Sequence, residues 1–177
     1  MDLDQVMDRR VSIRRYAKSA PPERGILEEL IRAAQKAPSW KNSQTGRYYV
    51  AASEEMKEKV REALPEYNRK SSENASALIV TTYVCGLSGF REGEPENELG
   101  DAWGAYDLGL QNAFLLLKAS ELGLDSLVMG IRDGDALRET LDIPDDEEVV
   151  AVIAIGRRTD DPPRRPRKAI EEISRFL

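Results

Sequence analysis

Arginine and serine side chains gather in a short segment near the start of the chain. Arg10, Ser12 and Arg14 occupy alternate positions directly after a short expected helix. In an extended chain, alternate side chains point to the same side, so these three can converge on one ligand. Arginine presents a planar fork of donors that matches a phosphate group. We interpret this segment as phosphate-binding, and a solvated basic turn that pairs with acidic residues is the competing interpretation.

A polar loop follows the next expected helix and carries amides, hydroxyls and an indole ring. Its candidate binding residues are Ser39, Trp40, Asn42 and Gln44. Asn and Gln amides each combine a donor with an acceptor, which suits the alternating donors and acceptors on a flavin ring edge. Trp40 can stack on a planar ring. An ordinary polar loop with a buried tryptophan fits the same residues.

A third group lies in the tail, where Arg165 and Arg167 flank Pro166. Proline stiffens the segment and reduces the entropy that is lost on docking. These two arginines can therefore approach a phosphate from a second direction.

The chain contains no histidine and a single cysteine, Cys85. Ser–His–Asp and Cys–His catalysis, histidine metal sites and thiolate zinc sites are thereby excluded. Neither a P-loop nor a Rossmann glycine fingerprint is present. We expect no metal and no catalytic side chain, so the remaining chemistry uses carboxylates, lysines, arginines or a bound organic cofactor.

The bulk composition is that of one globular domain covering residues 1–177, with 41% hydrophobic and 33% charged residues. The longest apolar run, Ala113–Leu117, is far too short to cross a membrane. A net charge of −6 argues against nucleic acid as a partner. The acidic N-terminus lacks the pattern of a signal peptide, and one cysteine forms no internal disulfide, so we expect a cytoplasmic protein.

Hydrophobic periodicity predicts an α+β fold, with a central mixed or antiparallel sheet of four to five strands flanked by helices. The longest helix, 102–122, is apolar on nearly every side, which is typical of burial or of a subunit interface. We expect a mobile loop or lid at 86–98, which is rich in Gly and Glu. The tail 160–177 is expected to lie along a surface. Strands are expected at 47–52, 77–85, 125–129 and 148–155.

The order of these motifs resembles that of the nitroreductase family, and the resemblance covers essentially the whole chain. The first two matching segments are specific, and the others would be weak alone. The matching segments are Arg10–Arg14, Ala37–Gln44, Leu110–Asn112, Leu122–Leu124, Met129–Gly130 and the closing basic, Pro-rich tail.

The resemblance implies an intertwined homodimer that binds FMN between its subunits, with the tail packing on the partner subunit. Arg10 and Ser12 are then expected near the phosphate and Arg14 near the ribityl chain or the N1–C2=O edge. Asn68 matches a family position that contacts the ring, and the backbone at Met129 and Gly130 faces the flavin near N5. The implied cofactor-binding set is Arg10, Val11, Ser12, Arg14, Ser39, Trp40, Asn42, Gln44, Asn68, Met129, Gly130, Arg165 and Arg167.

The implied activity is ping-pong hydride transfer from NADH or NADPH through flavin N5 to a small-molecule acceptor such as a nitroaromatic or a quinone. The chain departs from the family where Gln44 is followed by Thr45-Gly46-Arg47, since the family often has Pro-Trp there. Three alternatives remain at this level. They are an FMN store or sensor without turnover, a family variant with other flavin chemistry such as dehalogenation or azoline oxidation, and a cofactor-free helical dimerisation module.

Overall fold

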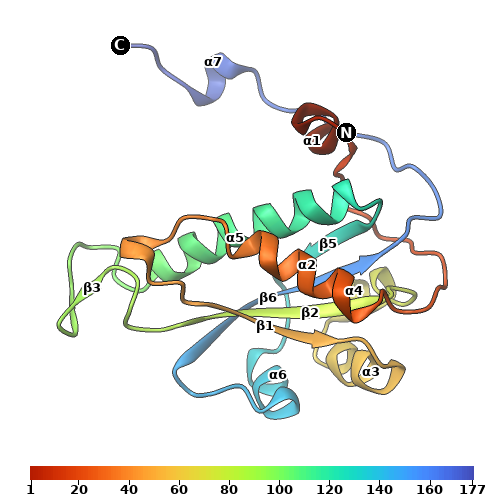
Figure 1. Ribbon diagram of the computed structural model, residues 1–177, viewed down its shortest axis with the longest axis horizontal. Coiled ribbons are helices and arrows are strands. Elements are labelled where there is room, and N and C mark those ends of the chain that lie inside the picture. The colour runs from red at the N-terminus through yellow and green to blue at the C-terminus, as the bar shows by residue number, and fades with distance from the viewer.

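The computed structural model describes residues 1–177 and has three layers, with helices on both faces of a central sheet. Helices α2 and α5 cover one face, and α3 and α6 cover the other (Figure 1). The helices are α1 (Leu3–Arg9), α2 (Arg24–Ala34), the 3-10 turn η1 (Trp40–Asn42), α3 (Glu54–Glu62), α4 (Glu66–Ser71), α5 (Ala102–Glu121), α6 (Gly134–Leu141) and α7 (Ile170–Ile173).

The central sheet has four strands in the order β1-β2-β6-β5, and every pair is antiparallel. The α+β prediction and all four expected strand positions are therefore confirmed, and the sheet is antiparallel rather than mixed. The strands are β1 (Gly46–Ala51), β2 (Ala77–Val84), β5 (Asp125–Met129) and β6 (Glu147–Gly156), and a separate short hairpin is formed by β3 (Phe90–Arg91) and β4 (Glu94–Pro95).

Alternation along the central strands fills two cores, one on each face of the sheet. Leu78 and Val80 of β2 pack into the core beneath α3 and α6. Ala77 and Ile79 of the same strand pack into the core beneath α2 and α5. Both faces of β2 are buried, which explains why its sequence is an almost continuous apolar and β-branched run.

Local capping explains where several helices begin. The Asp2 carboxylate accepts a hydrogen bond from the Gln5 amide at 2.9 Å, and the Gln5 side chain accepts one in return from the Asp2 amide, which completes a capping box. Ser53 and Asp133 cap α3 and α6 by a single bond each, since their side chains accept hydrogen bonds from the Met56 and Ala136 amides. The Asp2 cap fixes the start of α1, which leads into the arginine segment. The Asp133 cap fixes the start of α6, directly after the loop that follows β5.

Residues 86–98 and the tail after β6, for which the sequence predicts no extended helix or strand, have different structures. Within residues 86–98 the two short strands β3 and β4 form a hairpin, and the mobility expected for this segment stays a prediction. The tail after β6 runs away from the body past α1 and carries only the single helical turn α7 (Figure 1). No helix of the structure combines the length and the apolar character needed to cross a membrane.

Candidate functional site

The Arg10–Arg14 segment lies along the edge of β5 with its polar side chains facing outward. Ser12 forms a parallel bridge with Ser126, and the Ile13 amide donates to the Ser126 carbonyl at 3.0 Å. The Ile13 side chain is buried, whereas Ser12 and Arg14 are exposed. The core therefore anchors this segment through Ile13 and leaves the side chains at 12 and 14 free for a ligand.

Val11, which precedes Ser12, packs against the core beneath α3 and α6. Its side chain supports the segment, so only its backbone is available to a ligand.

A buried carboxylate joins the arginine segment to the start of the tail. Asp125 accepts hydrogen bonds from the Arg158 guanidinium at 2.6 and 2.9 Å and from the Arg158 amide at 2.7 Å. Arg9 lies 3.5 Å from the same carboxylate. Because Asp125 is buried, these charge-assisted bonds are strong, and they hold residues 9 and 158 together.

The tail brings further cations toward Arg10. Burial lowers the pKa of the Arg10 guanidinium, and the positive charges of Arg167 and then Arg164 lower that pKa further. No ion pair neutralises any of these three arginines. Asp125 and Asp161 line the same surface hollow as Arg164, but both of these carboxylates pair with Arg158. The three unpaired cations therefore favour an anion.

Arg165 is exposed and is not among the charges that act on Arg10. Arg164 was missed from the sequence, although a signal for it exists. A Pro-rich segment favours the polyproline II conformation, whose three residues per turn place positions 164 and 167 on one side. Arg165 therefore stays a prediction as a phosphate contact.

Asn68 lies close to the end of β5, and its contact with a cofactor stays a prediction. It lies on α4 with its side chain buried, and its Nδ2 donates to the Ile131 carbonyl at 2.9 Å. Met129 is the last residue of β5 and is buried, and Gly130 follows it on the surface. The Asn68 hydrogen bond fixes the backbone at Ile131, directly after Gly130. Asn68 therefore helps to hold the chain in place where β5 ends.

A surface hollow of about 660 Å³ opens beside Arg14. Its cations are Arg14, Arg15 and Lys70, and Tyr67 of α4 is 66% exposed at its wall. One carboxylate, Glu73, also lines it. The excess of positive charge suits a ligand that carries phosphate groups.

The second candidate group, the Ser39–Gln44 loop, is held in an unusual backbone conformation. Lys41, Asn42 and Gln44 have φ angles of 45°, 59° and 51°, in the left-handed region that non-glycine residues rarely adopt. The Ser39 hydroxyl accepts a hydrogen bond from the Gln44 amide at 3.0 Å, which closes the loop on itself. The Asn42 and Gln44 side chains remain exposed and free to meet a ligand.

Trp40 is directed toward its own subunit. Its ring centroid lies 4.7 Å from that of Trp103 on α5, with an interplanar angle of 50°. Such aromatic pairs stabilise packing beyond the area that they bury. The ring thus fastens the loop to α5, and its stacking on a flavin stays a prediction.

The departure at Thr45-Gly46 has a physical reason in the structure. Thr45 is fully buried, and its carbonyl accepts from the Val84 amide at 3.0 Å. A Cβ at Gly46 would overlap the Gln111 side chain and crowd Leu108. The glycine therefore allows β1 to begin directly against α5.

The two groups lie at opposite ends of α5. The Trp40 amide donates to Asp107, whereas Arg9 donates to the Ser120 carbonyl at 2.7 Å. Thirteen residues of helix separate these anchors, which corresponds to roughly 20 Å at 1.5 Å per residue. One subunit therefore presents the arginine segment and the polar loop as two separate surfaces.

Comparison with known proteins identifies sequence relatives over most of the chain. A sequence model described as the Nitroreductase family matches residues 7–157. A protein of Archaeoglobus fulgidus, provisionally named NADH dehydrogenase/NAD(P)H nitroreductase, is 31% identical over 156 residues, which cover 86% of this chain and 83% of that protein. The NADH dehydrogenase of Thermus thermophilus is 28% identical over 172 residues, covering 84% of this chain and 82% of that protein.

Solved structures share the complete fold. A provisionally assigned nitroreductase from Exiguobacterium sibiricum, solved in complex with FMN, superimposes with a TM-score of 0.90 at 24% identity and covers 100% of this chain and 98% of that one. At this identity the likeness establishes the fold and no more.

Proposed function

Because the chain belongs to the nitroreductase family, we propose that this oxidoreductase binds FMN and uses it to pass hydride from NADH or NADPH to a small acceptor. The observation that carries the proposal is the Asp125 network, which holds the start of the tail against Arg9, next to Arg10. Arg10, Arg164 and Arg167 form no ion pair and so remain available to an anion. A phosphate monoester with nearly two negative charges would neutralise these cations and relieve their repulsion.

The remaining residues of this surface fit the other parts of FMN. Ser12 and Arg14 project from the same extended segment and suit the ribityl hydroxyls and the N1–C2=O edge. Gly130, held by Asn68 through the neighbouring carbonyl, offers a backbone position without a side chain in the way. Bound FMN would supply the hydride chemistry, so that the protein has to bind, orient and shield it.

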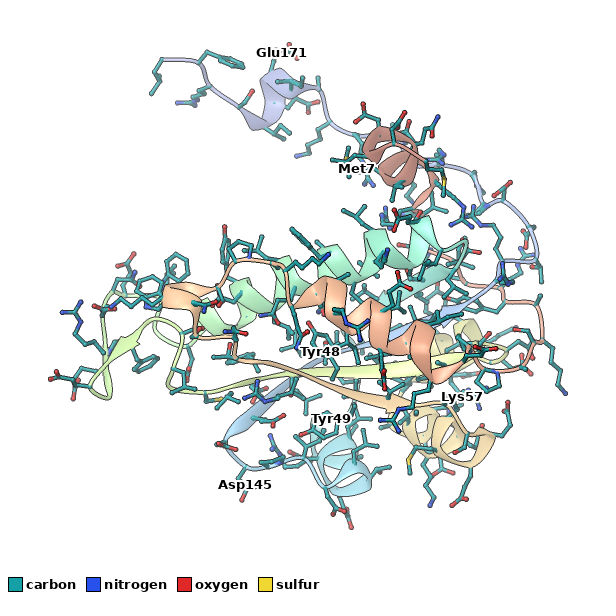
Figure 2. All side chains as sticks on the ribbon, in the orientation of Figure 1. Met7, Tyr48, Tyr49, Lys57, Asp145 and Glu171 are labelled. Carbon is teal, nitrogen blue, oxygen red and sulfur yellow. The ribbon has the colours of Figure 1, made fainter.

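A second copy of the chain would complete the site. One subunit holds the arginine segment and the polar loop roughly 20 Å apart, and a pair of subunits can bring one copy's loop over the other copy's arginines. The tail supports this arrangement, because Ile170, Ile173 and Phe176 are 62%, 70% and 91% exposed. Leu3 and Met7 on α1 are exposed as well, and Figure 2 shows Met7 on α1 and Glu171 on the extended tail. Apolar side chains left uncovered in this number need a partner surface.

The reductant is proposed to approach from the hollow beside Arg14. Arg15 and Lys70 there can meet the phosphates of a nicotinamide dinucleotide. The names of the two sequence relatives support a nicotinamide reductant. We propose a cytoplasmic homodimer whose acceptor is a nitroaromatic, a quinone or a similar small molecule.

An absorbance spectrum of the purified protein tests the proposal, recorded with FMN before and after anaerobic addition of NADPH or NADH. We expect flavin bands that bleach within seconds. Flavin bands that persist would replace the oxidoreductase with a flavin store or sensor. A protein that stays colourless in excess FMN would refute FMN binding altogether.

A further inference from the structure

A carboxylate is buried on the inward side of α5, in the first third of that helix. Asp107 is 2% exposed and forms no ion pair. Burial of an unpaired carboxylate is costly unless donors satisfy it. Packing of α5 alone therefore does not explain why a carboxylate is buried at position 107.

The donors that satisfy Asp107 come from two loops that are far apart in the sequence. The Trp40 amide donates to Asp107 Oδ2 at 2.8 Å, and the Ser88 hydroxyl donates to the same oxygen at 2.7 Å. One carboxylate oxygen thus joins α5 to the Ser39–Gln44 loop and to the start of the 86–98 segment.

The network continues from Ser88 back into the polar loop. Ser43 Oγ lies 2.7 Å and Thr45 Oγ1 lies 3.4 Å from Ser88 Oγ. Since the single hydroxyl proton of Ser88 is given to Asp107, Ser43 must donate to Ser88. Asp107 consequently holds both ends of the loop, directly at Trp40 and through Ser88 at Ser43.

The part of the chain between these two anchors is the part in the left-handed conformation. Lys41 and Asn42 lie between Trp40 and Ser43, and Gln44 follows directly. Backbone of this kind persists only where its surroundings over-determine it. The Asp107 network supplies that constraint for the stretch that carries the exposed side chains of Asn42 and Gln44.

We propose that Asp107 is a positioning residue for the flavin site, which sets the loop geometry that presents Asn42 and Gln44 to FMN. The proposal rests on the proposed function, since it deepens the role of the same loop. Asp107 itself touches no cofactor in this assignment and acts through Trp40 and Ser88.

Two substitutions at Asp107 separate positioning from charge. Both donors share one oxygen, so Asp107→Asn can keep both hydrogen bonds, whereas Asp107→Leu keeps the volume and loses them. We expect Asp107→Leu to weaken FMN binding about 10–100-fold and to shift the reduction potential of the bound flavin. Asp107→Asn should restore both properties to within about threefold of wild type.

Asn112→Leu is the matched control, because Asn112 is another buried polar residue of α5 and its hydrogen bond goes to Thr81 of β2 rather than to the loop. We expect it to leave the FMN affinity and the flavin potential unchanged. Ser88→Ala removes only the indirect anchor, and we expect a smaller loss of affinity than for Asp107→Leu. This variant keeps the Trp40 bond, so it tests the network even if Asp107→Leu fails to fold.

Hydrogen exchange of the amides of residues 40–45 in the cofactor-free proteins provides a readout that needs no flavin. We expect faster exchange there in Asp107→Leu and Ser88→Ala and wild-type exchange in Asp107→Asn. Wild-type affinity, potential and exchange in Asp107→Leu, or in Ser88→Ala where Asp107→Leu does not fold, would overturn the proposal. A wild-type protein that binds no FMN would instead refute the proposed function, and loop exchange would still report whether Asp107 holds the loop.

Discussion

The arginine segment and the polar loop are held by the fold in opposite ways. Arg10, Ser12 and Arg14 lie on ordinary extended backbone, which is anchored to the core through the buried Ile13 and the half-buried Val11. The loop has three left-handed residues and is fixed by Asp107 and by the Trp40–Trp103 pair. The arginine segment therefore presents cationic side chains on extended backbone. The polar loop presents polar groups on a constrained, partly left-handed backbone.

This difference matches two kinds of recognition. Long cationic side chains can adapt to a phosphate, because Coulomb attraction tolerates small changes of position. Hydrogen bonds to the edge of a ring require donors and acceptors at fixed positions, so the backbone that carries them has to be rigid. The comparison predicts that substitutions on the first surface change affinity through charge, whereas those on the second change it through shape.

The largest effect is expected from the tail, whose exposed apolar side chains we propose to pack on the partner subunit. Burying each such side chain stabilises by roughly 1.5–3 kcal/mol, so replacing Ile170, Ile173 and Phe176 together by Ser should weaken dimerisation by at least about 4.5 kcal/mol. Sedimentation over a range of protein concentrations measures this change. FMN affinity should fall in parallel, because neither surface is complete alone.

Exposed Val50→Ser on β1 is a control that removes surface apolar area away from the tail. An unchanged dimer in the triple variant would show that the tail does not lie at the interface.

The next effect concerns the cationic surface. Arg10→Ala should weaken FMN binding by about 1.5–3 kcal/mol through loss of a charge-assisted hydrogen bond, as measured by fluorescence titration. Arg164→Ala should weaken it less, and both losses should shrink at high salt. Arg24→Ala is the control, since Arg24 is an exposed arginine that pairs with Glu28 in α2. Wild-type affinity in Arg10→Ala would remove this residue from the site.

Most of the fold was predictable because the strands and helices follow period and capping rules. The four main strands and α5 begin and end within a few residues of the sequence expectation. The short hairpin within residues 86–98 was not predicted. This hairpin depends on Glu96 and Ser88 meeting Lys41 and Asp107, which are distant in the sequence.

The candidate site was predictable only in part, for a related reason. Arg10, Ser12 and Arg14 could be grouped because alternation in extended backbone is a local rule. The contact of Trp40 with Trp103 and the hydrogen bond to Asp107 could not be predicted in this way. Both depend on how the loop packs against α5. The only indication in the sequence was that Asp107 is the single aspartate within residues 102–121. Its hydrogen-bond partners could be identified only from the tertiary structure.

On the constrained surface, Gly46→Ala tests whether shape governs the loop. The added methyl group would overlap the Gln111 side chain, and overpacking of this kind should destabilise the protein by about 1–3 kcal/mol in urea unfolding. FMN affinity should also fall, because the loop end shifts. Gly25→Ala is the matched control, since nothing lies within 4 Å of a Cβ there and alanine favours the helix. Equal stability of the two variants would mean that β1 adapts at no cost.

The smallest effect is expected where the constrained loop meets the hairpin on the surface. Lys41 forms an ion pair with Glu96, and Arg91 lies 2.9 Å from the same carboxylate. The hydrogen bond from Lys41 lowers the pKa of Glu96 below its ordinary value of 4.5. A carboxyl whose pKa is lowered by folding contributes stability above its ordinary pKa, and that contribution is lost as the pH falls through the lower folded value.

Hydrogen exchange in the β3–β4 hairpin should therefore quicken slightly as the pH falls from about 6 to about 3.5, after correction for the intrinsic pH dependence of exchange. Glu96→Gln should show the quicker exchange at both pH values and lack the pH step. Glu98→Gln, which alters an exposed glutamate without an ion pair, should retain that step. Because the pair is exposed, high salt should reduce the difference between wild type and Glu96→Gln. If the step survives in Glu96→Gln, another carboxyl controls the hairpin and the loop is held by the buried Asp107 network alone.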